Sequence, residues 1–81
     1  MKITASKDFY KSFSKYDKKL QQQINKAVEK LPDGDVKKLK GKNNDFIYRL
    51  RVRDVRVVFI MNSESIHIID VDNRGDIYKT N

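Results

Sequence analysis

Two arginines in an alternating segment are the side chains of this sequence best suited to chemistry. Phe46, Tyr48, Leu50 and Val52 alternate with Ile47, Arg49, Arg51 and Arg53, and Arg49 and Arg51 are two positions apart. In a β-strand, residues i and i+2 project from the same face, about 7 Å apart. That separation is close to the phosphate spacing of an extended nucleic-acid strand, and guanidinium groups bind phosphate through paired hydrogen bonds. The pair therefore predicts a phosphate-binding surface.

The neighbouring elements are expected to bring a third arginine to this surface. The apolar residues of the segment must occupy the core face, so Arg49 and Arg51 project from the opposite face. A tight turn at residues 53–54 leads into a second strand that begins near Val55. Antiparallel pairing of the two strands places Arg56 beside Arg51 or Arg49.

The charge of the chain supports a polyanionic partner. Eighteen Lys and Arg oppose eleven Asp and Glu, which gives a net charge of +7 at pH 7. Eight of the basic residues, against Asp45 and Asp54 alone, lie between positions 37 and 56. Such a concentrated stretch is typical of nucleic-acid-binding proteins. The alternatives are a solvated lysine-rich surface and arginines paired with carboxylates, which the scarcity of nearby acids disfavours.

The first half of the chain predicts a short strand and two helices. Residues 2–5 suit the strand, Ser6 suits the N-cap of the first helix, and the second helix is expected to start near Asp17. Pro32 and Gly34 are expected to end the second helix. Its buried face should be formed by apolar residues at helical spacing. They are Leu20, Ile24, Val28 and Leu31.

The second half predicts three antiparallel strands after a basic loop. Residues 37–44 are expected to form that loop, with Gly41 as its pivot, and the period then changes to two. The expected fold is α+β, with an N-terminal strand and a helical hairpin packed on an antiparallel sheet. Residues 1–81 are expected to form a single domain.

Several functional classes are disfavoured by what the sequence lacks. There is no cysteine, which excludes disulfides, thiolate metal sites and a cysteine nucleophile. His67 is the only histidine and lies within a strand pattern, so we expect a structural role for it and no metal or cofactor. The N-terminal residues form no long apolar run, which predicts neither a signal peptide nor a membrane span. A cytoplasmic location is therefore expected.

Several segments of the chain together resemble the RelE/ParE toxin family. Residues 48–52 and 54–59 resemble its central hairpin, and residues 37–41 resemble its upstream basic segment. Residues 68–78 resemble its last strand and arginine-containing tail. The resemblance covers almost the whole chain and is closest to the RelE-like messenger RNA interferases. It implies a RelE-like fold and the toxin of a type II toxin–antitoxin system.

The resemblance also implies a reaction and the residues that perform it. A ribosome-dependent endoribonuclease of this kind cleaves messenger RNA in the ribosomal A site and needs no metal. The ribose 2′-hydroxyl attacks the adjacent phosphate and leaves a 2′,3′-cyclic phosphate. By position, the implied catalytic residues are Arg49, Arg51, Arg56, Arg74 and Tyr78. Arg56 and Arg74 would stabilise the developing phosphate charge, and Tyr78 would stack on a base.

Other basic residues are expected to add RNA contacts, but no general base is evident. The expected RNA-binding residues are Lys38, Lys40, Lys42 and Arg53. Arg53 occupies a position where relatives often have a turn glycine. Arginine remains protonated near neutral pH, so the arginines at the matched positions are poor bases. In the tail, only Asp76 and Tyr78 offer a titratable alternative.

The implied partners are a cognate antitoxin, the ribosome and messenger RNA, without a membrane or a small-molecule cofactor. Two other functions remain open. One is a ParE-like poison of DNA gyrase, and the other is a basic RNA-binding domain without catalysis. The match at five positions favours cleavage, because a gyrase poison has no need of those residues.

Overall fold

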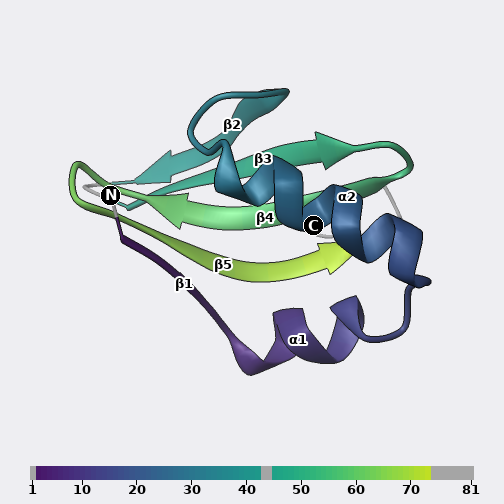
Figure 1. The fold of residues 1–81 in the computed structure, drawn as a ribbon. Helices are drawn as coiled ribbons and strands as arrows, with labels where there is room; N and C mark the ends of the chain where they lie inside the picture. Colours follow the sequence, from purple (N-terminus) through teal and green to yellow (C-terminus); the bar gives the residue numbers. More distant parts are fainter. Residues whose placement is uncertain (1, 43–44, 74–81) are drawn as a thin grey trace.

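The computed structural model describes residues 2–42 and 45–73, which form one sheet and two helices (Figure 1). The element order is β1 (Lys2–Ala5), α1 (Lys7–Phe13), α2 (Lys18–Glu29), β2 (Val36–Lys42), β3 (Asp45–Val52), β4 (Val55–Met61) and β5 (Ser65–Asp72). Within these residues the sheet has five strands in the order β1-β5-β4-β3-β2. β1 pairs with β5 in parallel, and the other neighbours pair antiparallel. The expected α+β fold is confirmed.

The helices begin where the sequence predicted, after Ser6 and Asp17, and both residues are N-caps. Ser6 Oγ accepts a hydrogen bond from the Phe9 amide at 3.1 Å, and Asp17 Oδ1 accepts one from the Leu20 amide at 2.8 Å. These bonds satisfy amides that have no partner inside a helix. α2 ends at Glu29, and Gly34 then adopts a φ of 115°, a conformation that favours glycine.

The core lies between the two helices and one face of the sheet. Phe9 of α1 and Ile24 of α2 are buried there against the apolar residues of the three central strands. The rings of Tyr48 and Phe59 stack across β3 and β4 with centroids 5.5 Å apart. The predicted buried face of α2 is confirmed. Leu20, Ile24 and Val28 of α2, and Leu31 just after its end, belong to this core or pack against it, as do Tyr48, Leu50 and Val52.

Residues 36–42 form an edge strand, so the prediction of a basic loop was wrong for residues 37–42. β2 pairs with β3 from Val36, opposite Leu50, to Lys42, opposite Asp45, with an irregularity between Lys38 and Lys40. The lysine-rich segment has no apolar alternation to reveal a strand, and its pairing depends on the free edge of β3. Lysines are common on edge strands because their charge discourages further pairing.

No helix within residues 2–42 and 45–73 is long and apolar enough to cross a membrane.

The β3–β4 turn yields a first testable prediction. Arg53 has a φ of 55°, a left-handed conformation that is strained for residues with a Cβ atom. Arg53→Gly should relieve this strain, which outweighs the extra entropy of glycine in the unfolded chain. We expect the free energy of unfolding to rise by about 0.5 kcal/mol in urea denaturation.

Asp54→Gly is the matched control for this prediction. Asp54 is the other turn residue and does not have a positive φ. Glycine there should lower the free energy of unfolding, because it adds only unfolded-state entropy. Equal destabilisation by both substitutions would show that Arg53 is not strained.

Candidate nucleic-acid interface

The face of the sheet opposite the two helices carries most of the predicted arginines. Both helices pack on the face that holds Val57 and Phe59. Residues that alternate with the core positions therefore project from the other face, which we call the open face. Its central side chains are Lys37, Arg49, Arg51, Arg56, Val58, Asp70 and Asp72.

Cross-strand pairing arranges these side chains in two rows. The first row runs Arg51, Arg56, Asp72, and the second runs Lys37, Arg49, Val58, Asp70. Directly opposed residues have Cβ atoms about 5 Å apart, and successive rows are about 7 Å apart. Each row is basic toward β2 and β3 and ends in a carboxylate on β5. The open face is therefore a cationic surface with an acidic border.

Arg51 and Arg56 occupy the exposed centre of the cationic surface. They are direct partners across β3 and β4, which confirms the predicted placement of Arg56 beside Arg51. Arg51 is exposed, whereas Arg56 is half-buried. Two adjacent guanidiniums favour an anion that binds to both, and phosphate has the geometry to do so.

Arg49 is anchored to the connection between α2 and β2. Its Nη1 donates to the carbonyl oxygen of Asp35 at 2.9 Å and to Asp35 Oδ1 at 3.1 Å. The same carbonyl accepts the Arg51 amide at 3.0 Å. The Arg49 side chain is only 15% exposed. Its guanidinium is thus held in place by a carboxylate that sequence proximity did not indicate, and an arginine has further N–H groups to offer an anion.

The lysines of β2 divide between the two faces. Lys37 lies opposite Arg49 and joins the open face, although the sequence analysis did not assign it to the site. Lys38 lies opposite Tyr48, and its Nζ is 3.9 Å from the centroid of the Phe46 ring. The structure therefore separates Lys38 from the arginines. The backbones of Lys40 and Lys42 pair with β3, but their side chains lie outside the described part of the structure.

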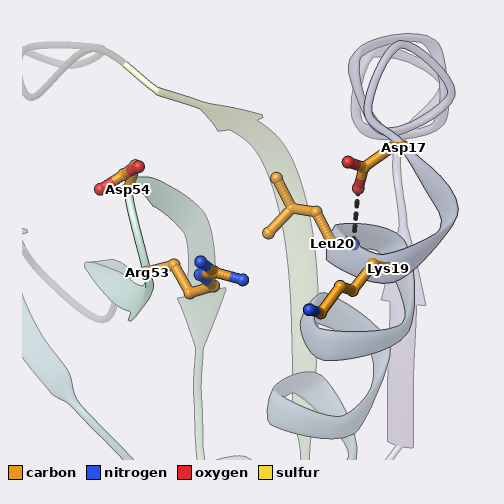
Figure 2. A pocket seen from close by; sticks show the side chains of 5 residues that line it. All are labelled: Asp17, Lys19, Leu20, Arg53 and Asp54. Atoms are coloured by element: carbon orange, nitrogen blue, oxygen red, sulfur yellow. Dashed lines mark hydrogen bonds between the residues drawn. The ribbon is translucent and has the colours of Figure 1, made fainter.

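Arg53 is also separated from the other arginines, because its turn conformation breaks the strand alternation. Its Nη1 donates to Gln23 Oε1 of α2 at 3.2 Å. Figure 2 shows its side chain directed toward α2, beside a pocket of about 210 Å³ that Lys19 and Leu20 also line. Arg53 therefore does not join the other arginines on the open face, although the sequence counted it among the RNA-binding residues. The predicted catalytic residues Arg74 and Tyr78, and the alternative base Asp76, lie outside the described residues.

The acidic border lies close to the C-terminal end of the first helical segment. Burial raises the pKa of Tyr16 above its ordinary value of 10.0, and the carboxylates of Asp72 and Asp70 raise that pKa further. Tyr16 therefore remains protonated near neutral pH and keeps a hydroxyl donor near both carboxylates. Tyr16, Lys15 and Asp72 line a pocket of about 330 Å³ at this edge.

His67 links the two parallel strands at the far end of the open face. Its Nδ1 is 2.7 Å from Thr4 Oγ1, its direct partner in β1. This contact agrees with the structural role expected for the histidine. Among the described residues, no group of three or more His, Asp or Glu could hold a metal ion.

Comparison with known proteins connects this fold to two archaeal complexes. No protein-family model matches the chain, and no curated protein sequence matches it. One chain of the RelE–RelB complex from Pyrococcus horikoshii OT3 matches with a TM-score of 0.77 and 23% identity, over 93% of this chain and 96% of that one. One chain of the RelB–RelE antitoxin–toxin complex from Methanococcus jannaschii matches with a TM-score of 0.73 and 26% identity, over 93% of this chain and 94% of that one. The chain therefore shares the fold found in these complexes, as the RelE-like prediction required.

Proposed function

We propose that this chain is the toxin of a type II toxin–antitoxin system and that it cleaves messenger RNA on the ribosome, in the cytoplasm. The observation that carries the proposal is the cationic part of the open face. Arg51 and Arg56 are adjacent there, and Arg49 is fixed in the next row by Asp35. A splayed RNA strand presents phosphates at about the spacing of these rows.

Each similar complex contains a toxin and an antitoxin, and the character of this chain favours the toxin. Its fold has a core of its own, with Ile24, Val57 and Phe59 fully buried. Its net charge of +7 and its basic sheet face suit a protein that acts on RNA. The sequence of the β3–β4 hairpin also resembles that of RelE-like interferases.

The proposed chemistry is transfer of the phosphoryl group to the neighbouring 2′-hydroxyl. Negative charge grows on the non-bridging phosphate oxygens in the transition state, and fixed guanidiniums stabilise that charge. Arg56 and Arg51 are the described residues best placed for this, and Arg74 and Tyr78 are proposed to complete the site. The ribosome would supply the alignment of message and toxin.

The proposed antitoxin has a segment that covers the open face. Three arginines and Lys37 on one small surface repel one another, so an acidic segment would neutralise them and block RNA at the same time. Asp70 and Asp72 would limit that segment to the cationic part of the face.

Cell-free translation of a defined message tests the proposal. Purified protein should stop translation and leave new 5′-hydroxyl ends inside the reading frame. A parallel supercoiling assay measures inhibition of DNA gyrase. Normal translation together with gyrase inhibition would contradict the proposal and favour a ParE-like poison.

RNA binding by the open face should depend strongly on salt. If three or four phosphates are neutralised, the logarithm of the association constant should fall with the logarithm of salt concentration with a slope of about −2 to −3. Fluorescence anisotropy with a labelled single-stranded RNA measures this slope. Arg51→Ala should reduce its magnitude by about 0.7, because one phosphate contact is lost. Affinity that does not change with salt would show that phosphate contacts do not drive binding.

A further inference from the structure

The proposed cleavage needs a group that accepts the proton of the 2′-hydroxyl. Arg49, Arg51, Arg56 and Lys37 are cations near neutral pH and do not accept protons there. The inference that follows rests on the proposed function and concerns the identity of this base. A base must lie within hydrogen-bond reach of the attacking hydroxyl, so it must be close to the phosphate-binding arginines.

Among the described residues, four side chains on or beside the open face are able to accept a proton, and their positions differ. Asp35 lies in the connection before β2, where its Oδ1 is 3.1 Å from Arg49 Nη1. His67 lies opposite Ile60, two rows beyond the Arg51–Arg56 pair, and its Nδ1 contacts Thr4. Asp70 lies opposite Val58, and its Oδ1 accepts a hydrogen bond from the Val71 amide at 2.8 Å. Asp72 belongs to the same row as the two arginines, directly opposite Arg56.

We infer that Asp72 is the general base of the proposed cleavage reaction. Arg56 and Asp72 are directly opposed, with Cβ atoms about 5 Å apart, so Asp72 lies on the strand next to the arginines that would bind the phosphate. Asp72 is half-buried and ends β5, beyond the residues of β5 that pair with β1. A phosphate on the arginines and a ribose beside it would thus place the 2′-hydroxyl next to a fixed carboxylate.

The groups around Asp72 suit a base that works while ionised. Arg56 faces it from β4, with Arg51 behind Arg56 on β3. Lys15 and Tyr16 line the same pocket as Asp72 from the helical side, and Asp70 precedes it on β5. The two arginines offset the repulsion between the carboxylate and the RNA phosphates. Tyr16 stays protonated near these two carboxylates. It therefore adds a hydroxyl dipole and no further negative charge.

The step balances without any further reagent. The Asp72 carboxylate takes the proton of the 2′-hydroxyl while the 2′-oxygen forms a bond to phosphorus. The bond between phosphorus and the 5′-oxygen breaks, and the leaving oxygen takes a proton from water. The products are a 2′,3′-cyclic phosphate and a 5′-hydroxyl, and Asp72 then returns its proton to the solvent.

The test compares Asp72→Asn with Asp70→Asn in single-turnover cleavage on programmed ribosomes, at several pH values. Each substitution removes one negative charge from β5. Both variant proteins should therefore bind RNA at least as tightly as the wild type. Asp72→Asn should lower the cleavage rate about a hundredfold, the size expected for loss of a general base. Asp70→Asn should stay within about threefold of the wild type, and Asp72→Glu should recover part of the rate.

The pH profile separates a base from a residue that only shapes the site. Wild-type cleavage should fall at acidic pH, where a carboxylate becomes protonated, and should level off above that range. The residual rate of Asp72→Asn should instead rise about tenfold per pH unit, because hydroxide must replace the carboxylate. A folded Asp72→Asn that retains the wild-type rate, or the wild-type pH profile at a lower rate, overturns the inference and leaves the proposed function intact. Absence of cleavage by the wild type overturns both.

Discussion

Arg56→Ala is expected to lower the rate of messenger RNA cleavage on programmed ribosomes about a hundredfold. Arg56 lies between Arg51 and Asp72 in the first row of the open face. If it stabilises charge that develops on the phosphate, its loss should cost about 3 kcal/mol in the transition state. Arg56→Lys should recover only part of the rate, because lysine keeps the charge and loses the paired hydrogen bonds.

Two controls separate this catalytic effect from a change in stability. Arg56 is half-buried on the strand surface, so the free energy of unfolding of Arg56→Ala should fall by less than about 1 kcal/mol. Arg53→Ala removes the same charge from a side chain that contacts Gln23 of α2, and it should leave cleavage close to the wild-type rate. Full activity of folded Arg56→Ala would remove the open face from the catalytic site.

Ile24→Ala is expected to lower the free energy of unfolding by about 3 kcal/mol. Ile24 is the one residue of α2 that is completely buried, and it packs between the helix and the apolar face of the sheet. A short chain buries a limited fraction of its surface, so it has little stability to lose. The melting temperature should fall by about 12 to 24 °C.

Leu39→Ala is the matched control for the core substitution. Leu39 is 44% exposed on the edge strand β2, so its truncation leaves no cavity. The free energy of unfolding of the Leu39→Ala variant should stay within about 0.5 kcal/mol of the wild-type value. Similar losses for the two variants would mean that the contact between α2 and the sheet contributes little to stability.

The parts of the fold set by local pattern were predictable from the sequence. Alternation in residues 46–53 identified β3 and its two faces, and the short 53–54 turn placed Arg56 beside Arg51 or Arg49. The structure pairs it with Arg51. Ser6 and Asp17 identified the helix starts, because a capping side chain bonds within its own segment. Both kinds of inference depend on residues close together in the chain.

The missed features depend on contacts between distant segments. β2 forms a strand only because β3 offers a free edge, and its lysines give no alternation. Asp35 reaches Arg49 across 14 positions of sequence, and Asp72 meets Arg56 through the pairing of β4 with β5. A left-handed φ turned Arg53 toward α2, whereas alternation alone would have left it beside Arg51.

The proposed role of the open face is tested most directly by mapping the ends of a message after single-turnover incubation with programmed ribosomes. Wild-type protein should produce cuts at the A-site codon, with 2′,3′-cyclic phosphate on one fragment and a 5′-hydroxyl on the other. The folded Arg51→Ala/Arg56→Ala double variant should produce none in the same time. An intact message with the wild-type protein, or the same cuts with the folded double variant, would contradict the account.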